Sequence, residues 1–167
     1  MTKNERCPYG GAIDADGHIR EPSDVWEKYI DPQYRGRAIR ISKDQGGLKI
    51  LEIGCGPSKQ RRAGQLARSG AMGKSGEDLE PHPDQTYVNQ APFGSMDPKE
   101  RVGLLDQDGL DKAILYPTLG VAWETEDVED LKLQAAYARA YNRWIVEFCS
   151  DPGGRLIPIA QLSFGDP

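Results

Sequence analysis

The sequence lacks the features of membrane, secreted and nucleic-acid-binding proteins. Within its 167 residues no run approaches the roughly 18 consecutive apolar residues of a membrane span, and the N-terminus, MTKNERCPYGG, has no apolar signal segment. Basic residues are not in excess, because 21 Lys and Arg stand against 26 Asp and Glu for a net charge of −5. We therefore expect a cytoplasmic protein with neither a membrane nor a nucleic-acid partner.

Thiol and histidine motifs are also scarce. The three cysteines, Cys7, Cys55 and Cys149, lie far apart and form no CxxC pair, so a zinc knuckle or a thioredoxin-like site is excluded. Of the two histidines, His18 and His82, the second stands between two prolines in a polar segment, where an exposed position is expected. Apolar residues make up only 38% of the chain and the mean hydropathy is −0.63, which predicts a modest core or one shared with a partner.

The apolar spacing predicts alternating strands and helices. The expected order is a strand at 12–19, a helix at 24–30 capped by Ser23, a hairpin of strands at 38–42 and 48–53, a long polar loop at 54–95 with a short helix near 61–68, a helix starting at Pro98 with Asp97 as its cap and Gly109 as its end, a strand at 112–118, a helix at 127–149 and a strand at 155–164. This order is typical of an α/β protein with parallel strands, and 167 residues supply only part of a parallel barrel, which needs about 200 or more.

The first candidate site is the pattern Asp14-x-Asp16-x-His18 in the first expected strand. Residues two apart in a strand point to the same side, so the two carboxylates and the imidazole are predicted to share one face. Such groups suit a divalent ion, with Zn²⁺ as the first choice and Mn²⁺ or Fe²⁺ as alternatives. A strand end with a turn-capping aspartate and a surface histidine is the alternative interpretation.

A second candidate, KILEIGCGP at 49–57, looks like the first motif of S-adenosylmethionine-dependent methyltransferases. In that fold the glycine-rich turn opens a helix, and an apolar strand ending in an acid follows about 20 residues later. Here the acids Glu77 and Asp78 follow no apolar strand, and a hairpin leads into the motif. We keep a methyltransferase as the less favoured alternative.

A third candidate is Tyr116-Pro117-Thr118, which places polar groups at the C-terminal end of a buried strand. Parallel α/β folds bind their ligands at that end of the sheet. A plain strand end stopped by proline is the alternative. Together with Asp16 and His18, this segment predicts a single site at one edge of the sheet.

Several short segments resemble amidohydrolase-related proteins, the group that includes metal-dependent hydrolases and carboxylate decarboxylases. The resemblance covers nearly the whole chain and is weakest at 54–95. The segments that carry it, in the order which that family shows, are IDADGH at 13–18, EP at 21–22, Trp26, DPQYR at 31–35, RVGLLD at 101–106, GLD at 109–111, LYPT at 115–118, AYN at 140–142 and GRLIP at 154–158.

The resemblance implies the N-terminal part of one (β/α)₈ barrel, about three βα units over 1–167, with a hairpin and loop insertion at 37–95. It makes Asp16 and His18 ligands of a divalent metal at the barrel mouth. Asp14 lies one step deeper in the strand, so we expect it to have a supporting or structural role. Thr118, Tyr116 and Glu21 are then candidate contacts to a small carboxylate-, amide- or lactone-type substrate. The family's remaining ligands and its general acid or base have no counterpart in this sequence, so no catalytic residue is assigned.

The expected function is therefore metal-dependent hydrolysis or decarboxylation, with a second polypeptide completing the barrel. A non-catalytic subunit or truncated scaffold that keeps this surface for interactions is the rival from another class. Stoichiometric metal in the purified protein would separate the two, because a scaffold has no need of it.

Overall fold

The computed structural model describes residues 11–68, 75–76, 80–126, 128–150 and 153–164. Its larger sheet has three parallel strands in the order β1-β5-β6, formed by Ile13–His18, Lys112–Tyr116 and Leu156–Pro158. Ala113 and Leu115 of the central strand are fully buried. The predicted α/β class with parallel strands is confirmed.

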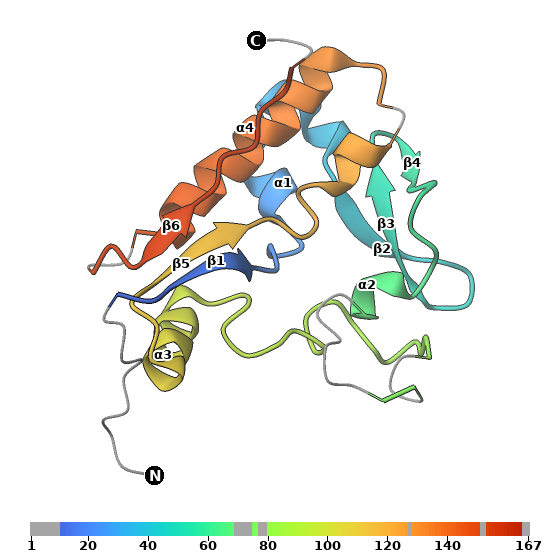
Figure 1. Cartoon of the computed structure of the whole chain (residues 1–167). Coiled ribbons are helices and arrows are strands. Elements are labelled where there is room, and N and C mark those ends of the chain that lie inside the picture. Colours follow the sequence, from blue (N-terminus) through green and yellow to red (C-terminus); the bar gives the residue numbers. More distant parts are fainter. Residues whose placement is uncertain (1–10, 69–74, 77–79, 127, 151–152, 165–167) are drawn as a thin grey trace.

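Two long helices accompany this sheet (Figure 1), α3 at Pro98–Asp108 and α4 at Leu131–Phe148. The predicted start of α3 is confirmed, since the Asp97 carboxylate accepts hydrogen bonds from the backbone N–H groups of Lys99 (2.8 Å) and Glu100 (3.0 Å). Gly109 ends α3 with φ of 72°, a left-handed conformation that glycine adopts without strain.

Helix α4 carries the main apolar face of the molecule. Its buried side chains include Leu133, Tyr141, Trp144 and Ile145, and the short helix α1 at Val25–Tyr29 packs against it. The helix begins at Leu131, later than the predicted 127, because Asp130 caps it by accepting from the N–H of Leu133. The predicted start, Asp127, lies outside the described residues.

The predicted hairpin forms a second, antiparallel sheet of β2 (Arg40–Lys43), β3 (Lys49–Ile53) and β4 (Gly56–Pro57). Figure 1 shows this small sheet beyond the C-terminal ends of β1 and β5. Two 3₁₀ helices at Pro32–Arg37 and Ala122–Thr125, and the four-residue helix α2 at Gln65–Arg68, complete the elements. The insertion therefore lies at the sheet edge where the candidate site was predicted.

Other predicted boundaries also differ from the structure, since β5 ends at Tyr116 and not at 118. Ser23 does not cap α1; Asp24 stands at the cap position, and neither side chain makes a capping bond there. The last strand covers only Leu156–Pro158 and not 155–164, although the N–H of Ile159 still donates to the Leu115 carbonyl of β5 at 3.2 Å.

Candidate functional site

A β-bulge near the end of β1 shapes the site. Asp14 pairs with Ala113, whereas Gly17 pairs with Leu115 and His18 with Tyr116, so β1 has one residue more than β5 over this stretch. The extra residue reverses the side-chain alternation. A Cβ on Gly17 would lie 2.8 Å from Asp14 Oδ2 and 3.2 Å from Leu115 Cδ2, so Asp14 lies on the face of Gly17, opposite that of His18. The prediction that Asp14 shares a face with Asp16 and His18 is wrong.

His18 and Asp16 remain together after the bulge. The Nε2 atom of His18 lies 3.8 Å from Oδ1 of Asp16, and both side chains are exposed. His18 Nδ1 lies 3.0 Å from the carbonyl oxygen of Pro117. A carbonyl oxygen only accepts hydrogen bonds, so Nδ1 carries the proton, and in the neutral ring Nε2 keeps a free lone pair. The arrangement presents one imidazole lone pair and one carboxylate to the same space.

A cavity of about 370 Å³ lies beside His18, at the C-terminal ends of β1, β5 and β6. Its polar lining comes from His18, Tyr116, Glu124 and Gln161. The remaining lining is mostly apolar and consists of Pro117, Val121, Ile159, Ala160, Leu162 and Phe164. The Tyr116 ring centroid is 6.0 Å from that of His18. The predicted sheet edge thus contains a cavity whose lining combines a few polar side chains with a larger apolar surface.

Thr118 and Glu21 lie near this cavity but do not line it. The backbone N–H of Thr118 donates to Glu21 Oε1 at 3.0 Å, and the two following N–H groups, of Leu119 and Gly120, donate to the same carboxylate at 2.9 and 2.8 Å. Glu21 is fully buried. Burial raises the pKa of its carboxyl, and the three backbone donors oppose that rise.

Glu124 and Gln161 were missed by the sequence analysis. Gln161 donates from Nε2 to the Gly120 carbonyl at 2.6 Å, and its backbone is held at both polar groups by the Asn142 side amide, each bond being 2.8 Å long. The amide of Gln161 also reaches Glu124 Oε1 at 3.4 Å. Neither residue belongs to a motif or follows a strand directly, so no sequence signal points to them.

Two buried arginines hold the end of β1. Arg101 of α3 donates from Nη2 to the carbonyl of His18 and from Nε to that of Gly94 at 2.8 Å. Arg20 donates to the Leu66 carbonyl at 3.0 Å, and its guanidinium lies 4.0 Å from the centroid of the Tyr87 ring. Burial lowers the pKa of both arginines. These contacts anchor β1 to α3 and to the insertion.

The ligand groups of the described residues fit only part of a metal site. Zn²⁺ lies about 2.0–2.2 Å from nitrogen and oxygen ligands in tetrahedral sites, so two atoms bound to one ion are roughly 3.4 Å apart. The 3.8 Å between His18 Nε2 and Asp16 Oδ1 is a few tenths of an ångström longer than this. No group of three or more His, Cys, Asp and Glu side chains suited to a metal occurs among the residues described here. Asp16 and His18 are thus the two predicted ligands that the structure brings together, and among the described residues no third such side chain joins them.

The motif at 49–57 has the wrong structure for a methyltransferase. Gly54, with φ of 73°, turns the chain back on itself, and β4 pairs antiparallel with β3. The Gly54 N–H is bound by the hydroxyl of Tyr137 in α4. The glycine-rich turn therefore closes a hairpin and opens no helix, which contradicts the methyltransferase interpretation at its defining feature.

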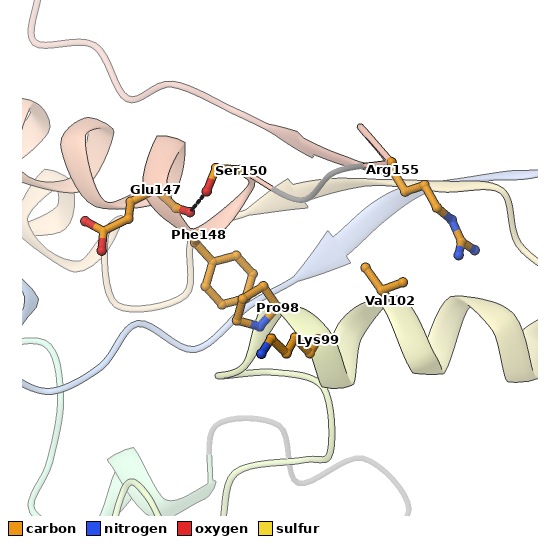
Figure 2. A pocket seen from close by; sticks show the side chains of 8 residues that line it. Pro98, Lys99, Val102, Glu147, Phe148, Ser150 and Arg155 are labelled. Carbon is orange, nitrogen blue, oxygen red and sulfur yellow. Dashed lines mark hydrogen bonds between the residues drawn. The ribbon is translucent and has the colours of Figure 1, made fainter.

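Another cavity, of about 450 Å³, lies between α3 and α4 (Figure 2). Pro98, Val102 and Phe148 form its apolar part, and none of the predicted site residues lines it. Arg155 at its rim already donates to the Asp106 carboxylate and the Leu110 carbonyl. This hollow belongs to the helix layer and is separate from the site at the strand ends.

Comparison with known proteins bears on the fold. One solved structure that matches is the crystal structure of amidohydrolase map2389c from Mycobacterium avium subsp. paratuberculosis K-10, with a TM-score of 0.67 and 21% sequence identity. The match covers 94% of this chain and 44% of that one. This chain has part of an amidohydrolase-like fold. Its length spans less than half of the amidohydrolase it matches. No family model and no curated protein matches the sequence.

The amidohydrolase-like fold agrees with the family resemblance inferred from the short segments. Among the described residues, no helix is both long and apolar enough to cross a membrane.

Proposed function

We propose that this chain is the N-terminal part of a metal-dependent amidohydrolase-like hydrolase or decarboxylase. It would supply about three βα units of one (β/α)₈ barrel over residues 1–167, with 37–95 inserted at the barrel mouth. The parallel order β1-β5-β6 and the match to part of an amidohydrolase support this assignment.

The observation that carries the proposal is the state of His18. Its Nδ1 donates to the Pro117 carbonyl, and its Nε2 lies beside Asp16 at the cavity. Metal-binding histidines commonly donate their second N–H to a carbonyl or carboxylate, which fixes the ring and leaves the other nitrogen for the ion. A surface histidine needs no such bond.

Asp16 and His18 would hold Zn²⁺, or alternatively Mn²⁺ or Fe²⁺, together with ligands from the rest of the barrel. The bound ion would supply activation of water or polarisation of a substrate oxygen. Tyr116 would contact a small carboxylate-, amide- or lactone-type substrate, and Thr118 would lie at the edge of that pocket. The apolar wall around Ile159 and Leu162 would exclude water from the apolar part of the substrate.

The rest of the barrel would come from further strands, carried by a longer form of this protein or by a second polypeptide. In the described sheet β1 and β6 each pair on one side only. Ile13, Leu162 and Phe164 are 50%, 63% and 90% exposed, which is costly for large apolar side chains left in water. Co-purification with about 100–250 residues of additional chain is expected; a monodisperse 18.5 kDa monomer that unfolds cooperatively would refute it.

Elemental analysis with native mass measurement tests the metal site. The protein, with whatever completes its barrel, is expected to hold stoichiometric divalent metal, and His18→Ala is expected to lose it. His82→Ala is the matched control, because His82 lies in the insertion and lines no part of the cavity. Full occupancy in His18→Ala would show that the ligand assignment is wrong.

A non-catalytic scaffold is the second candidate. The observation in its favour is that the described residues bring together two ligands and no third. A scaffold predicts no stoichiometric metal in either the original protein or the His18→Ala variant, so the same measurement decides between the two functions.

A further inference from the structure

We propose that Glu21 is a positioning residue, which fixes the tautomer and direction of His18 through a single peptide group. The proposal rests on the proposed function in one respect: the Nε2 lone pair of His18 is aimed so that it can bind a ligand. The structural basis of the proposal is a series of hydrogen bonds that runs from Asn142 through Gln161, Gly120 and Glu21 to His18.

The decisive contact is shared by two residues. The peptide group between Pro117 and Thr118 accepts from His18 Nδ1 at its carbonyl (3.0 Å) and donates to Glu21 Oε1 from its N–H (3.0 Å). A peptide group is planar and its C=O and N–H point in opposite directions, so fixing one end fixes the other. Glu21 therefore determines where the carbonyl that holds His18 points, and its charge strengthens that carbonyl as an acceptor.

The Glu21 carboxylate has no freedom to leave this position. Oε1 also accepts from the N–H of Gly120 at 2.8 Å, and Oε2 accepts from that of Leu119 at 2.9 Å. A Cβ on Gly120 would lie 3.0 Å from Glu21 Oε1 and 2.9 Å from Pro117 Cβ, so the loop closes tightly around the carboxylate. With its oxygens buried against the backbone, Glu21 acts on the loop and not on a molecule in the cavity.

Gln161 and Asn142 brace the same loop from the other side. Gln161 Nε2 donates to the Gly120 carbonyl at 2.6 Å, and the Asn142 side chain of α4 binds the Gln161 backbone at both its N–H and its carbonyl. Gln161 is 95% buried, given a relative exposure of 5%. The segment 117–120 is thus held between Glu21, three residues beyond His18, and a glutamine that follows β6.

Imidazole nitrogens report the tautomer directly, because protonated and unprotonated ring nitrogens resonate at well-separated ¹⁵N shifts. The test is a long-range ¹H–¹⁵N correlation spectrum of the metal-free, ¹⁵N-labelled protein at about pH 8, above the usual histidine pKa of about 6.5. The chain has two histidines, so His82→Ala leaves the His18 signals alone. We expect a protonated Nδ1 and an unprotonated Nε2 in His18, and the opposite tautomer in His82, whose Nδ1 accepts from the Asp84 N–H at 3.2 Å.

Glu21→Gln replaces one acceptor oxygen with a donor and removes the charge, so the His18 shifts are expected to move toward those of a ring exchanging both tautomers. Glu126→Gln is the matched control, because Glu126 clamps a different segment, the N–H groups of Lys59 and Gln60. That variant should leave His18 unchanged.

Three results would overturn the proposal: an Nε2-protonated His18, a His18 that averages both tautomers, or unchanged His18 shifts in folded Glu21→Gln. If Glu21→Gln does not fold, Gln161→Met decides instead, since it removes the side-chain bonds to Gly120 and Glu124 and keeps the backbone bonds to Asn142. A partial change in the His18 shifts supports the proposal, and unchanged shifts overturn it. Because no metal is present, failure of the metal assignment and failure of this inference are separate outcomes.

Discussion

Replacing Gly17 with alanine would place a methyl group where β1 contacts β5. The new Cβ would lie 2.8 Å from Asp14 Oδ2, 3.1 Å from the Ile114 carbonyl oxygen and 3.2 Å from Leu115 Cδ2. Asp14 can rotate away, but the Ile114 carbonyl is backbone of the central strand and Leu115 is fully buried. The strand itself must therefore move, and overpacking of this kind costs about 1–3 kcal/mol.

Urea unfolding followed by the fluorescence of the three tryptophans measures this cost. With a denaturant slope near 2 kcal/mol/M, the midpoint of Gly17→Ala should fall by roughly 1 M. Gly103→Ala is the matched control: Gly103 lies inside α3 with nothing within 4 Å of its added Cβ, so the helix should gain about 0.5–1 kcal/mol. A Gly17→Ala variant with the original midpoint would refute the bulge geometry described here.

Three further predictions concern the insertion. Tyr137→Phe removes the hydroxyl that accepts from the Gly54 N–H (2.9 Å) and donates to the Arg37 carbonyl (2.5 Å), so it should cost about 1–3 kcal/mol and speed exchange of the Gly54 amide; normal protection of that amide would contradict this. Hydrogen bonds from Ser58, Lys59 and Gln60 hold the pKa of Glu126 below its ordinary value despite burial, so its stabilising contribution is present at neutral pH and is lost as pH falls below about 5. Glu126→Gln should therefore lose less stability on acidification than the original protein. An equal loss of unfolding free energy in the two proteins would contradict this. In a Cys7→Ser background, a thiol reagent should modify exposed Cys55 faster than half-buried Cys149; equal rates would show that the turn at Cys55 is closed.

The sequence predicted best the elements whose ends carry capping residues or glycine. The segment DPKE at 97–100 and the glycine at 109 located both ends of α3, because capping and left-handed glycine are properties of a few neighbouring residues. The hairpin and the amphipathic α4 followed from periodicity in the same way. The start of α4 was predicted less sharply, at about 127, whereas Asp130 caps the helix by accepting from the N–H of Leu133.

The sequence by itself determined the class of the fold, the strand ends that form the site and the neighbourhood of Asp16 and His18. Only the tertiary structure decided which side chains face each other there. The bulge in β1 removes Asp14 from the face of His18, because an inserted residue appears only when register with β5 is known. The bond from His18 to the Pro117 carbonyl spans 99 positions, as does that between Glu21 and Gly120. Contacts between residues so far apart depend on how β1, β5 and β6 are brought together, and no local pattern encodes them.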